Sequence, residues 1–163
     1  MGYKISFTGY RESKLPFYGE DDPMLAEFKE RLYNKIVEMI KQGADLFFSG
    51  MALGIDIYAA DAVLKAREDH PDIQLIAVIP CPEQDIQWSA AQQKHYRDIL
   101  SQCDQIITVS PRYDKGCMHR RNRTLVEMCD YLFAVYDGKP GGTEYTIKYA
   151  NKLGRPVIYF PPK

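Results

Sequence analysis

The stretch Asp45–Asp56, Asp-Leu-Phe-Phe-Ser-Gly-Met-Ala-Leu-Gly-Ile-Asp, contains the signal that decides the fold class. Its first residues form a short apolar run typical of a buried strand, and Gly50 ends that run. An alanine-rich segment follows from about Ile55 to Glu68, with its apolar residues on one side, which is typical of a helix packed on a sheet. A strand that leads through a glycine turn into such a helix is the first half of a β-α-β unit.

The same alternation continues along the whole chain. Strands are expected at Lys4–Thr8, Asp45–Ser49, Ile73–Ile79, Gln105–Val109, Tyr131–Tyr136 and Pro156–Phe160. Helices are expected from Pro23 to the closing Gly43, and at Ile55–Glu68, Ser89–Gln102, Met118–Cys129 and Thr143–Leu153. Consecutive β-α-β units require a mostly parallel sheet with helices on both faces. The sequence therefore predicts one domain over residues 1–163, a Rossmann-like three-layer α/β/α sandwich with a mostly parallel sheet of about six strands.

Composition argues against several classes of protein. The net charge is −1, so there is no global basic field to attract a nucleic acid, and an anion site must be local. No apolar run approaches the roughly 20 residues of a membrane span, and the first residues follow a strand pattern instead of that of a signal peptide. The four cysteines contain no CxxC pair and no histidine is clustered with them. We expect a cytoplasmic protein with reduced thiols, no metal, no other cofactor and no membrane partner.

Glycine turns follow three of the predicted strands. The carboxyl ends of parallel strands form the ligand-binding edge of such a sheet. Thr8–Arg11 combines a tight turn with an arginine that reaches a phosphate, although a plain turn with a solvated arginine is the alternative. Ser49–Gly54 and Lys139–Thr143 each precede a helix, where free backbone N–H groups and the helix dipole attract anions. Tight-turn geometry alone is the alternative for the glycine pair of Lys139–Thr143.

A fourth candidate element, which is basic, begins a later helix. Cys117–Arg123 contains three arginines within four residues, which cannot all face the core. Asp56 lies in the first turn of its helix, where helix capping is the structural alternative to a functional role. The candidate ligand-binding residues are Thr8, Gly9, Arg11, Ser49, Gly50, Gly54, Arg121, Asn122, Arg123, Gly141, Gly142 and Thr143.

These motifs resemble those of the SLOG superfamily, which unites DNA-processing protein A with the LOG-type nucleotide phosphoribohydrolases. Ser49–Asp56 resembles the Ser-Gly-x-Ala-x-Gly-Ile-Asp signature of DNA-processing proteins, and Arg121–Arg123 their Arg-Asn-Arg element. Gly142–Arg155 is similar to their Gly-Ser-x-x-Thr-x-x-x-Ala-x-x-x-Gly-Arg helix. The resemblance covers about residues 45–160, with the motifs in the family's order. It implies a Rossmann-like fold, a nucleotide-like ligand and a homodimer.

Two further segments resemble the YpsA/YoqJ-like subgroup of compact bacterial and phage proteins. They are Thr8–Arg11 and the segment from Pro80 to Trp88. The Gln-to-Trp stretch recurs in that subgroup, which implies that Gln84 and Trp88 line the pocket, with Trp88 stacking on a base. Packing of Trp88 between helix and sheet is the alternative.

The resemblance to the phosphoribohydrolases is only partial. Their catalytic glutamates follow the threonine as Thr-x-Glu-Glu, whereas the matching positions after Thr143 hold Tyr145 and Thr146. Glu144 is offset by one residue, which turns it about 100° around a helix. Cleavage of an N-glycosidic bond passes through an oxocarbenium-like state that a carboxylate stabilises. Weak catalytic candidates are Glu144, Arg121 and Asp56.

Three functions follow in order of preference. The first is binding of a nucleotide or nucleotide-derived phosphate ligand at the carboxyl edge of the sheet, as a sensor or regulator. The second is hydrolysis of a nucleoside 5′-monophosphate of the LOG type. The third is single-stranded DNA binding, for which Arg120, Arg121, Arg123 and Lys139 would supply a local basic strip.

Overall fold

Six strands form one sheet in the computed structural model, which describes residues 2–163. They are β1 (Tyr3–Gly9), β2 (Ala44–Ser49), β3 (Gln74–Ile79), β4 (Gln105–Thr108), β5 (Tyr131–Val135) and β6 (Val157–Phe160). Their spatial order is β4-β3-β2-β1-β5-β6, and every neighbouring pair is parallel. The predicted Rossmann-like α/β fold is confirmed. The sheet is fully parallel, where the sequence predicted a mostly parallel one.

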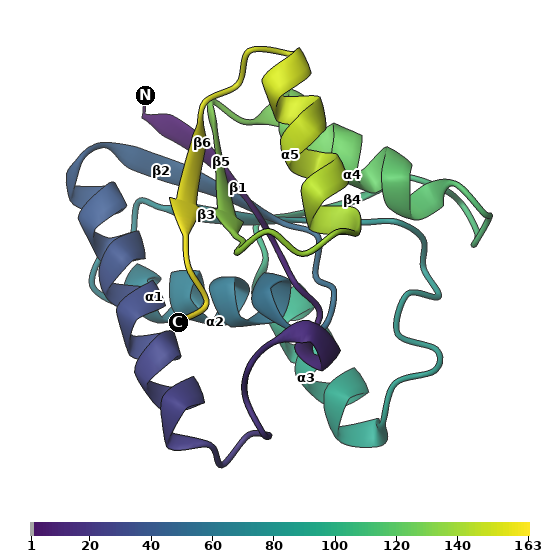
Figure 1. The fold of residues 1–163 in the computed structure, drawn as a ribbon, viewed down its shortest axis with the longest axis horizontal. Coiled ribbons are helices and arrows are strands. Elements are labelled where there is room, and N and C mark those ends of the chain that lie inside the picture. The colour runs from purple at the N-terminus through teal and green to yellow at the C-terminus, as the bar shows by residue number, and fades with distance from the viewer. Residues whose placement is uncertain (1) are drawn as a thin grey trace.

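Five α-helices connect the strands: α1 (Pro23–Lys41), α2 (Ile55–Arg67), α3 (Ala90–Gln102), α4 (Cys117–Met128) and α5 (Gly142–Lys152). The first three pack on one face of the sheet, and α4 and α5 lie together on the other (Figure 1). The ends of these elements lie within two residues of the predicted ones. A short 3₁₀ helix, η1 (Glu12–Lys14), was not predicted. None of the helices within residues 2–163 is long and apolar enough to cross a bilayer.

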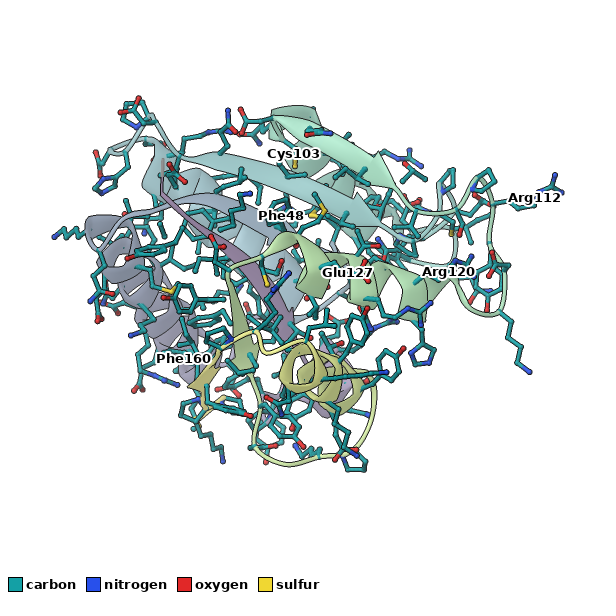
Figure 2. All side chains as sticks on the ribbon, turned by 90° about the horizontal axis from the view of Figure 1, so that it is seen from above. Phe48, Cys103, Arg112, Arg120, Glu127 and Phe160 are labelled. Carbon is teal, nitrogen blue, oxygen red and sulfur yellow. The ribbon has the colours of Figure 1, made fainter. Side chains whose placement is uncertain are left out.

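The core consists of apolar side chains on both faces of the sheet. Phe7 stacks on Phe47 with ring centroids 5.9 Å apart and meets Phe133 edge-on, and all three rings are fully buried. Phe48 follows Phe47 and points to the opposite face, toward α4 (Figure 2), where it belongs to one cluster with Leu125. Because strand side chains alternate between faces, consecutive phenylalanines serve both layers.

The order of connections creates a switch point between β1 and β5. The chain moves outward from β1 to β4 and then returns to place β5 on the other side of β1. Right-handed crossovers in opposite directions put their helices on opposite faces of the sheet. The turns after β1 and β5 therefore diverge and leave a crevice between them.

The helices differ in how their first N–H groups are capped, and this matters for the helices that begin at the crevice. Asp22 caps α1 by accepting the Met24 N–H at 2.9 Å, and Ser89 and Gln92 form a reciprocal capping box at the start of α3. The other three helices, α2, α4 and α5, begin after Gly54, Gly116 and Gly141, which have no side chain to accept their first N–H groups. Those groups need other partners.

Candidate functional site

A cavity of about 400 Å³ lies at the carboxyl ends of β1 and β5. We call it the switch-point cavity. It is lined by Phe7, Thr8, Gly9, Tyr10, Arg11, Ser13, Lys14, Ala52, Asp56, Arg121, Asn122, Leu125, Pro140, Gly141, Gly142 and Thr143. Its walls therefore come from the turns after β1 and β5, from the first turns of α2 and α5, and from the middle of α4. The volume is within the range of small-molecule sites.

Two arginines that line this cavity converge on a single sulfur atom. Arg11 and Arg121 both direct an Nη2 group at the thioether sulfur of Met118, at 4.0 and 3.9 Å. A thioether is a weak acceptor. Within residues 2–163 the structure gives Arg11 no carboxylate within salt-bridge distance. Burial, together with the nearby charge of Arg11, lowers the pKa of Arg121. Donors and positive charge thus accumulate at a place where protein acceptors are poor.

Arg121 is held from behind by the α2 loop, residues 50–54. Its side chain is buried, and Nη1 donates to the Gly50 carbonyl and, at 3.2 Å, to Oε1 of Gln84. Nε donates to Oδ1 of Asn122 at 2.9 Å. Since the oxygen of the Asn122 amide is used in this way, its Nδ2 group is a donor on the cavity wall, close to Gly142.

Asp56 faces Arg121 across Gly50. A Cβ atom on Gly50 would lie 2.8 Å from Arg121 Nη1 and 2.9 Å from Asp56 Oδ2. The same carboxylate oxygen accepts the Ala52 N–H at 3.3 Å. Burial raises the pKa of Asp56, although the charges of Arg121 and Arg11 oppose that rise. The helix cap is Gly54, so the capping role considered for Asp56 is wrong. Its carboxylate instead organises the loop before the helix.

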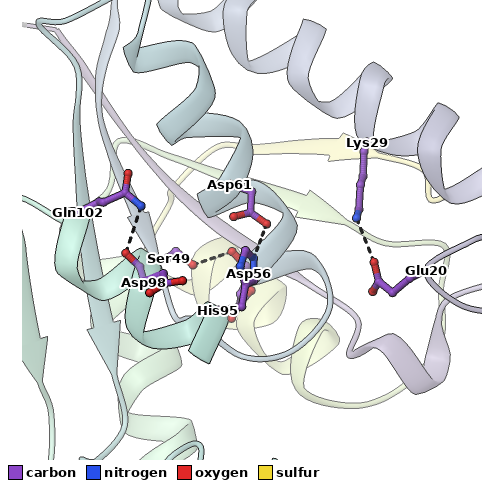
Figure 3. Close-up of polar contacts among 8 residues, drawn as sticks. All are labelled: Glu20, Lys29, Ser49, Asp56, Asp61, His95, Asp98 and Gln102. Carbon is purple, nitrogen blue, oxygen red and sulfur yellow. Dashed lines mark hydrogen bonds and ion pairs between the residues drawn. The ribbon is translucent and has the colours of Figure 1, made fainter. Parts of the chain in front are cut away.

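Ser49 is part of the scaffold of the site. Its side chain is fully buried, its hydroxyl donates to the Asp56 carbonyl at 2.8 Å (Figure 3), and it accepts the Met51 N–H at 3.1 Å. Gly54 lies on the far side of the loop with φ +97°, where a Cβ would stand 2.5 Å from the Tyr10 carbonyl. The structure therefore turns the α2 loop inward, and Ser49, a predicted ligand residue, does not belong to the cavity lining.

The turn before α5, residues Pro140–Thr143, faces the cavity directly. The first hydrogen bond of the helix runs from the Tyr145 N–H to the Gly141 carbonyl at 3.0 Å. The N–H groups of residues 142–144 therefore have no acceptor within the helix, and they lie at the positive end of the helix dipole. Gly141, Gly142 and Thr143 line the cavity as predicted, and Lys14 Nζ donates to the Pro140 carbonyl at 3.0 Å beside them.

The strand β1 brings Thr8 and Gly9 to the same cavity. A Cβ on Gly9 would lie 2.5 Å from Cβ of Ile55, so the absence of a side chain lets the end of β1 pack against α2. Gly9 thus serves close packing of strand and helix, and the backbone beside it forms the cavity floor.

The arginines of α4 point in three directions. Of the three arginines of α4, only Arg121 lines the switch-point cavity. Arg120 pairs with Asp114 and Ser110, and Arg123 donates to the Tyr145 hydroxyl at 2.8 Å. Arg123, a predicted ligand residue, instead contacts α5. Successive helix residues are separated by about 100°, so neighbouring arginines cannot share one target.

The segment Gln84–Trp88 also differs from its expected role. The Gln84 amide nitrogen donates to the Gly50 carbonyl and the Tyr96 hydroxyl, both at 3.2 Å. Trp88 meets Tyr96 edge-on with centroids 5.0 Å apart. Neither side chain belongs to the cavity lining. Gln84 supports Arg121 from behind, and the packing alternative describes Trp88.

Glu144 turns away from the cavity. Its Oε2 accepts the Tyr136 hydroxyl at 3.3 Å and its Oε1 lies 3.6 Å from Lys148. Among the described residues that line the cavity, Asp56 carries the only carboxylate. The predicted offset of Glu144 on the helix thus places its carboxylate outside the cavity.

Sequence reasoning missed Lys14, Ser13 and Met118. The first two line the cavity because η1 follows directly after Arg11. Lys14 lies three residues after Arg11, and side chains at that spacing share one side of a 3₁₀ helix. That spacing was a usable signal, whereas nothing local in the sequence shows that two arginines would meet at the sulfur of Met118.

Comparison with known families agrees with these motifs. The YpsA family model, described as the YspA SLOG family, matches residues 5–158. The chain belongs to this family. The predicted membership of the SLOG superfamily and of its YpsA-like subgroup is therefore confirmed.

Relatives of this SLOG chain include several UPF0398 proteins. The UPF0398 protein BH1768 of Halalkalibacterium halodurans is 32% identical over 151 residues, which cover 91% of this chain and 80% of the relative. A UPF0398 protein of Bacillus cereus is 30% identical over 153 residues, covering 92% and 83%.

A solved structure shares the fold. DNA processing protein A from Helicobacter pylori, described for its single-stranded DNA binding mode, superposes with a TM-score of 0.67 and 23% identity. The match covers 97% of this SLOG chain and 65% of that protein. At this identity the likeness shows the fold alone.

Proposed function

We propose that the chain binds a nucleotide or another nucleotide-derived phosphate ligand in the switch-point cavity, as a sensor or regulator. The observation that carries this proposal is the convergence of Arg11 and Arg121 on the sulfur of Met118. Two guanidinium groups with one nearby carboxylate, that of Asp56, leave a net positive charge, and a phosphate between them would balance that charge and supply better acceptors than a thioether.

The rest of the cavity supports an anion of this kind. The N–H groups at the start of α5 and the Nδ2 group of Asn122 are donors on the same wall, and Lys14 adds a cation at the rim. A helix N-terminus and a guanidinium are the groups that proteins most often use for phosphate. They meet here at the switch point, where parallel sheets place their ligands.

Hydrolysis is less well supported than binding. The carboxylate of Asp56 already accepts the Ala52 N–H and compensates Arg121, and Glu144 is engaged outside the cavity. A glycosidic transition state needs a carboxylate directed at the sugar. The geometry therefore favours a site that holds its ligand without cleaving it.

Isothermal titration with inorganic phosphate and with AMP tests the proposal. Arg11→Met removes one exposed cavity cation, and Arg112→Met is the matched control, because Arg112 projects outward from the loop before α4 (Figure 2). We expect wild type and Arg112→Met to bind alike and Arg11→Met to bind about tenfold more weakly, since a charge-assisted contact is lost. Equal binding by the two variants would contradict the site. Mass spectrometry of any co-purifying nucleotide would identify the ligand directly.

Single-stranded DNA binding is a second candidate, because the structural neighbour is described for that activity. Exposed Arg11 and Lys14 line the cavity, and exposed Lys139 donates to the Lys14 carbonyl at 2.9 Å beside it, so all three could contact phosphates. The predicted strip is interrupted, however, since Arg121 is buried and Arg123 contacts Tyr145. DNA binding predicts a steep fall in affinity with salt. Fluorescence anisotropy with a labelled oligothymidylate at low salt would remove this candidate if no binding appears.

A further inference from the structure

A second cavity lies beside the first, on the side of α1, α2 and α3. Its volume is about 800 Å³, and we call it the α1–α3 cavity. It is lined by Glu12, Ser13, Leu15, Phe17, Tyr18, Gly19, Glu20, Leu25, Lys29, Leu53, Gly54, Ile57, Tyr58, Asp61, Ala91, Gln92 and His95. The function proposed above does not involve this cavity.

The two cavities adjoin at Ser13, and elsewhere the η1 turn and the α2 loop form a wall between them. Ser13 lines both of them. Arg11 and Lys14, three residues apart, line the switch-point cavity, whereas Glu12 and Leu15, also three residues apart, line the α1–α3 cavity. This division follows from the 3₁₀ turn, which has three residues per turn and so sorts its side chains onto separate sides.

The α2 loop forms the other part of the wall. Ala52 lines the switch-point cavity, and Leu53 and Gly54 line the α1–α3 cavity. The Ile55 N–H donates to the Tyr10 carbonyl at 3.2 Å, and the glycine at position 54 permits this approach. The wall is thus held in place by backbone contacts.

The chemistry on the two sides of the wall is opposite. The α1–α3 cavity has three carboxylates, Glu12, Glu20 and Asp61, against the single lysine Lys29. Asp61 contacts His95 at 2.9 Å and Lys29 contacts Glu20 at 3.4 Å (Figure 3). A phosphate is therefore repelled here and attracted across the wall.

Apolar and aromatic groups complete the α1–α3 cavity. Leu25, Leu53 and Ile57 provide an apolar surface beside Tyr58. Burial raises the pKa of the Tyr58 phenol to about 12, so its hydroxyl stays neutral. Oε1 of Glu12 accepts a hydrogen bond from Nε2 of Gln92 at 3.2 Å. Such a site suits an uncharged, partly planar group with hydroxyls, because acidic side chains bind ribose hydroxyls in nucleotide sites.

We infer that the α1–α3 cavity holds the base and sugar of a nucleoside 5′-phosphate whose phosphate lies in the switch-point cavity. This inference rests on the proposed function. It also gives the base a location, which Gln84 and Trp88 do not provide, since both lie outside the switch-point lining. The bonds between phosphate and sugar then cross at Ser13, which lines both cavities, and η1 separates the charged part of the ligand from the uncharged part.

Two adjacent alanines allow a sharp test. Ala91 lines the α1–α3 cavity, whereas its exposed neighbour Ala90 does not belong to that lining. Both residues are exposed in the first turn of α3, so tryptophan at either position leaves the core intact. Ala91→Trp fills the cavity, and Ala90→Trp is the matched control. Isothermal titration is carried out with AMP, GMP, CMP, UMP, ribose 5-phosphate and inorganic phosphate.

The expected result separates base from phosphate. At least one monophosphate binds wild type and Ala90→Trp more tightly than inorganic phosphate does, and Ala91→Trp weakens that binding about tenfold or more. Inorganic phosphate binds all three proteins equally. Glu12→Ala, an exposed change, weakens ribose 5-phosphate and the monophosphate severalfold without changing phosphate affinity.

Failure of the inference and failure of the proposed function look different. If wild type binds phosphate but Ala91→Trp and Ala90→Trp bind every monophosphate equally, the base lies elsewhere and only this inference is wrong. The same follows if no monophosphate binds more tightly than phosphate. If wild type binds none of the six compounds, both proposals are overturned.

Discussion

The loop before α2 and the loop before α5 look alike in sequence and differ in the structure. Each follows a central strand, contains two glycines and opens a helix. The α2 loop is closed by protein groups: Asp56 accepts the Ala52 N–H, and Arg121 donates to the Gly50 carbonyl. The α5 loop, in contrast, presents its free N–H groups to a cavity. One loop thus builds the site, and the other is positioned to contact what enters it.

The largest effect is expected from Arg121→Met. The change leaves the buried Asp56 facing Gly50 without its compensating charge, and we expect the free energy of unfolding to fall by about 3 kcal/mol. Urea denaturation measures this. Adding Asp56→Asn to the same chain should recover most of the loss, since no uncompensated charge remains, but phosphate binding stays lost. A single variant as stable as wild type would show that the α2 loop is not held by these charges.

A smaller effect should separate the two loops directly. Gly50→Ala places a Cβ 2.8 Å from Arg121 Nη1, and overpacking of this kind costs about 2 kcal/mol. In Gly142→Ala the nearest atom is Asn122 Nδ2 at 3.9 Å, so we expect a change within about 0.5 kcal/mol. Thermal or urea unfolding of both variants checks the pair. Equal destabilisation would remove the distinction between the loops.

The affinity for an anion should change severalfold with pH. Because burial raises the pKa of Asp56, this carboxyl gains a proton in the folded protein at a higher pH than an ordinary aspartate. Protonation removes a negative charge beside Arg11 and Arg121, so sulfate affinity should rise as the pH falls toward the ordinary pKa of an aspartate. The free energy of unfolding should rise over the same interval relative to Asp56→Asn, since the native state binds the proton more tightly.

Titration calorimetry with sulfate in both proteins measures the first of these changes. Asp56→Asn should bind sulfate tightly and without this pH dependence. An identical pH dependence in the two proteins would mean that another group titrates at the site.

The smallest effect is expected from Glu144→Gln. Glu144 lies in the first turn of α5, outside the cavity, and pairs with Lys148 at the surface. We expect stability within about 0.5 kcal/mol of wild type and unchanged phosphate affinity. Incubation with AMP should release no free base from either protein. Base release by wild type that disappears in Glu144→Gln would instead establish a hydrolase.

Much of the fold was predictable because its signals are local. Apolar runs of strand length, alternating with amphipathic segments, placed the ends of the strands and helices within two residues. The turn η1 escaped prediction, since Glu12-Ser13-Lys14 has no apolar periodicity. Yet this turn divides the two cavities, and its side chains decide the charge of each.

The site was predictable in position but only partly in membership. Gly9, Arg11 and Gly141–Thr143 line the switch-point cavity as expected. Ser49 and Arg123 do not, because their polar groups already bind the Asp56 carbonyl and the Tyr145 hydroxyl. Whether the lining residues bind a ligand, and whether the chain dimerises, stay predictions.

By itself, the sequence determined the parallel α/β sheet, the edge at which its glycine turns gather, and the family. Those features follow from periodicity, chain direction and short motifs, which neighbouring residues define. Only the tertiary structure decided that Arg121 is buried while Arg11 is exposed, that both meet at Met118, and that the α2 loop turns inward. Those outcomes depend on which face of each helix packs on the sheet, and contacts between residues distant in the chain determine that choice.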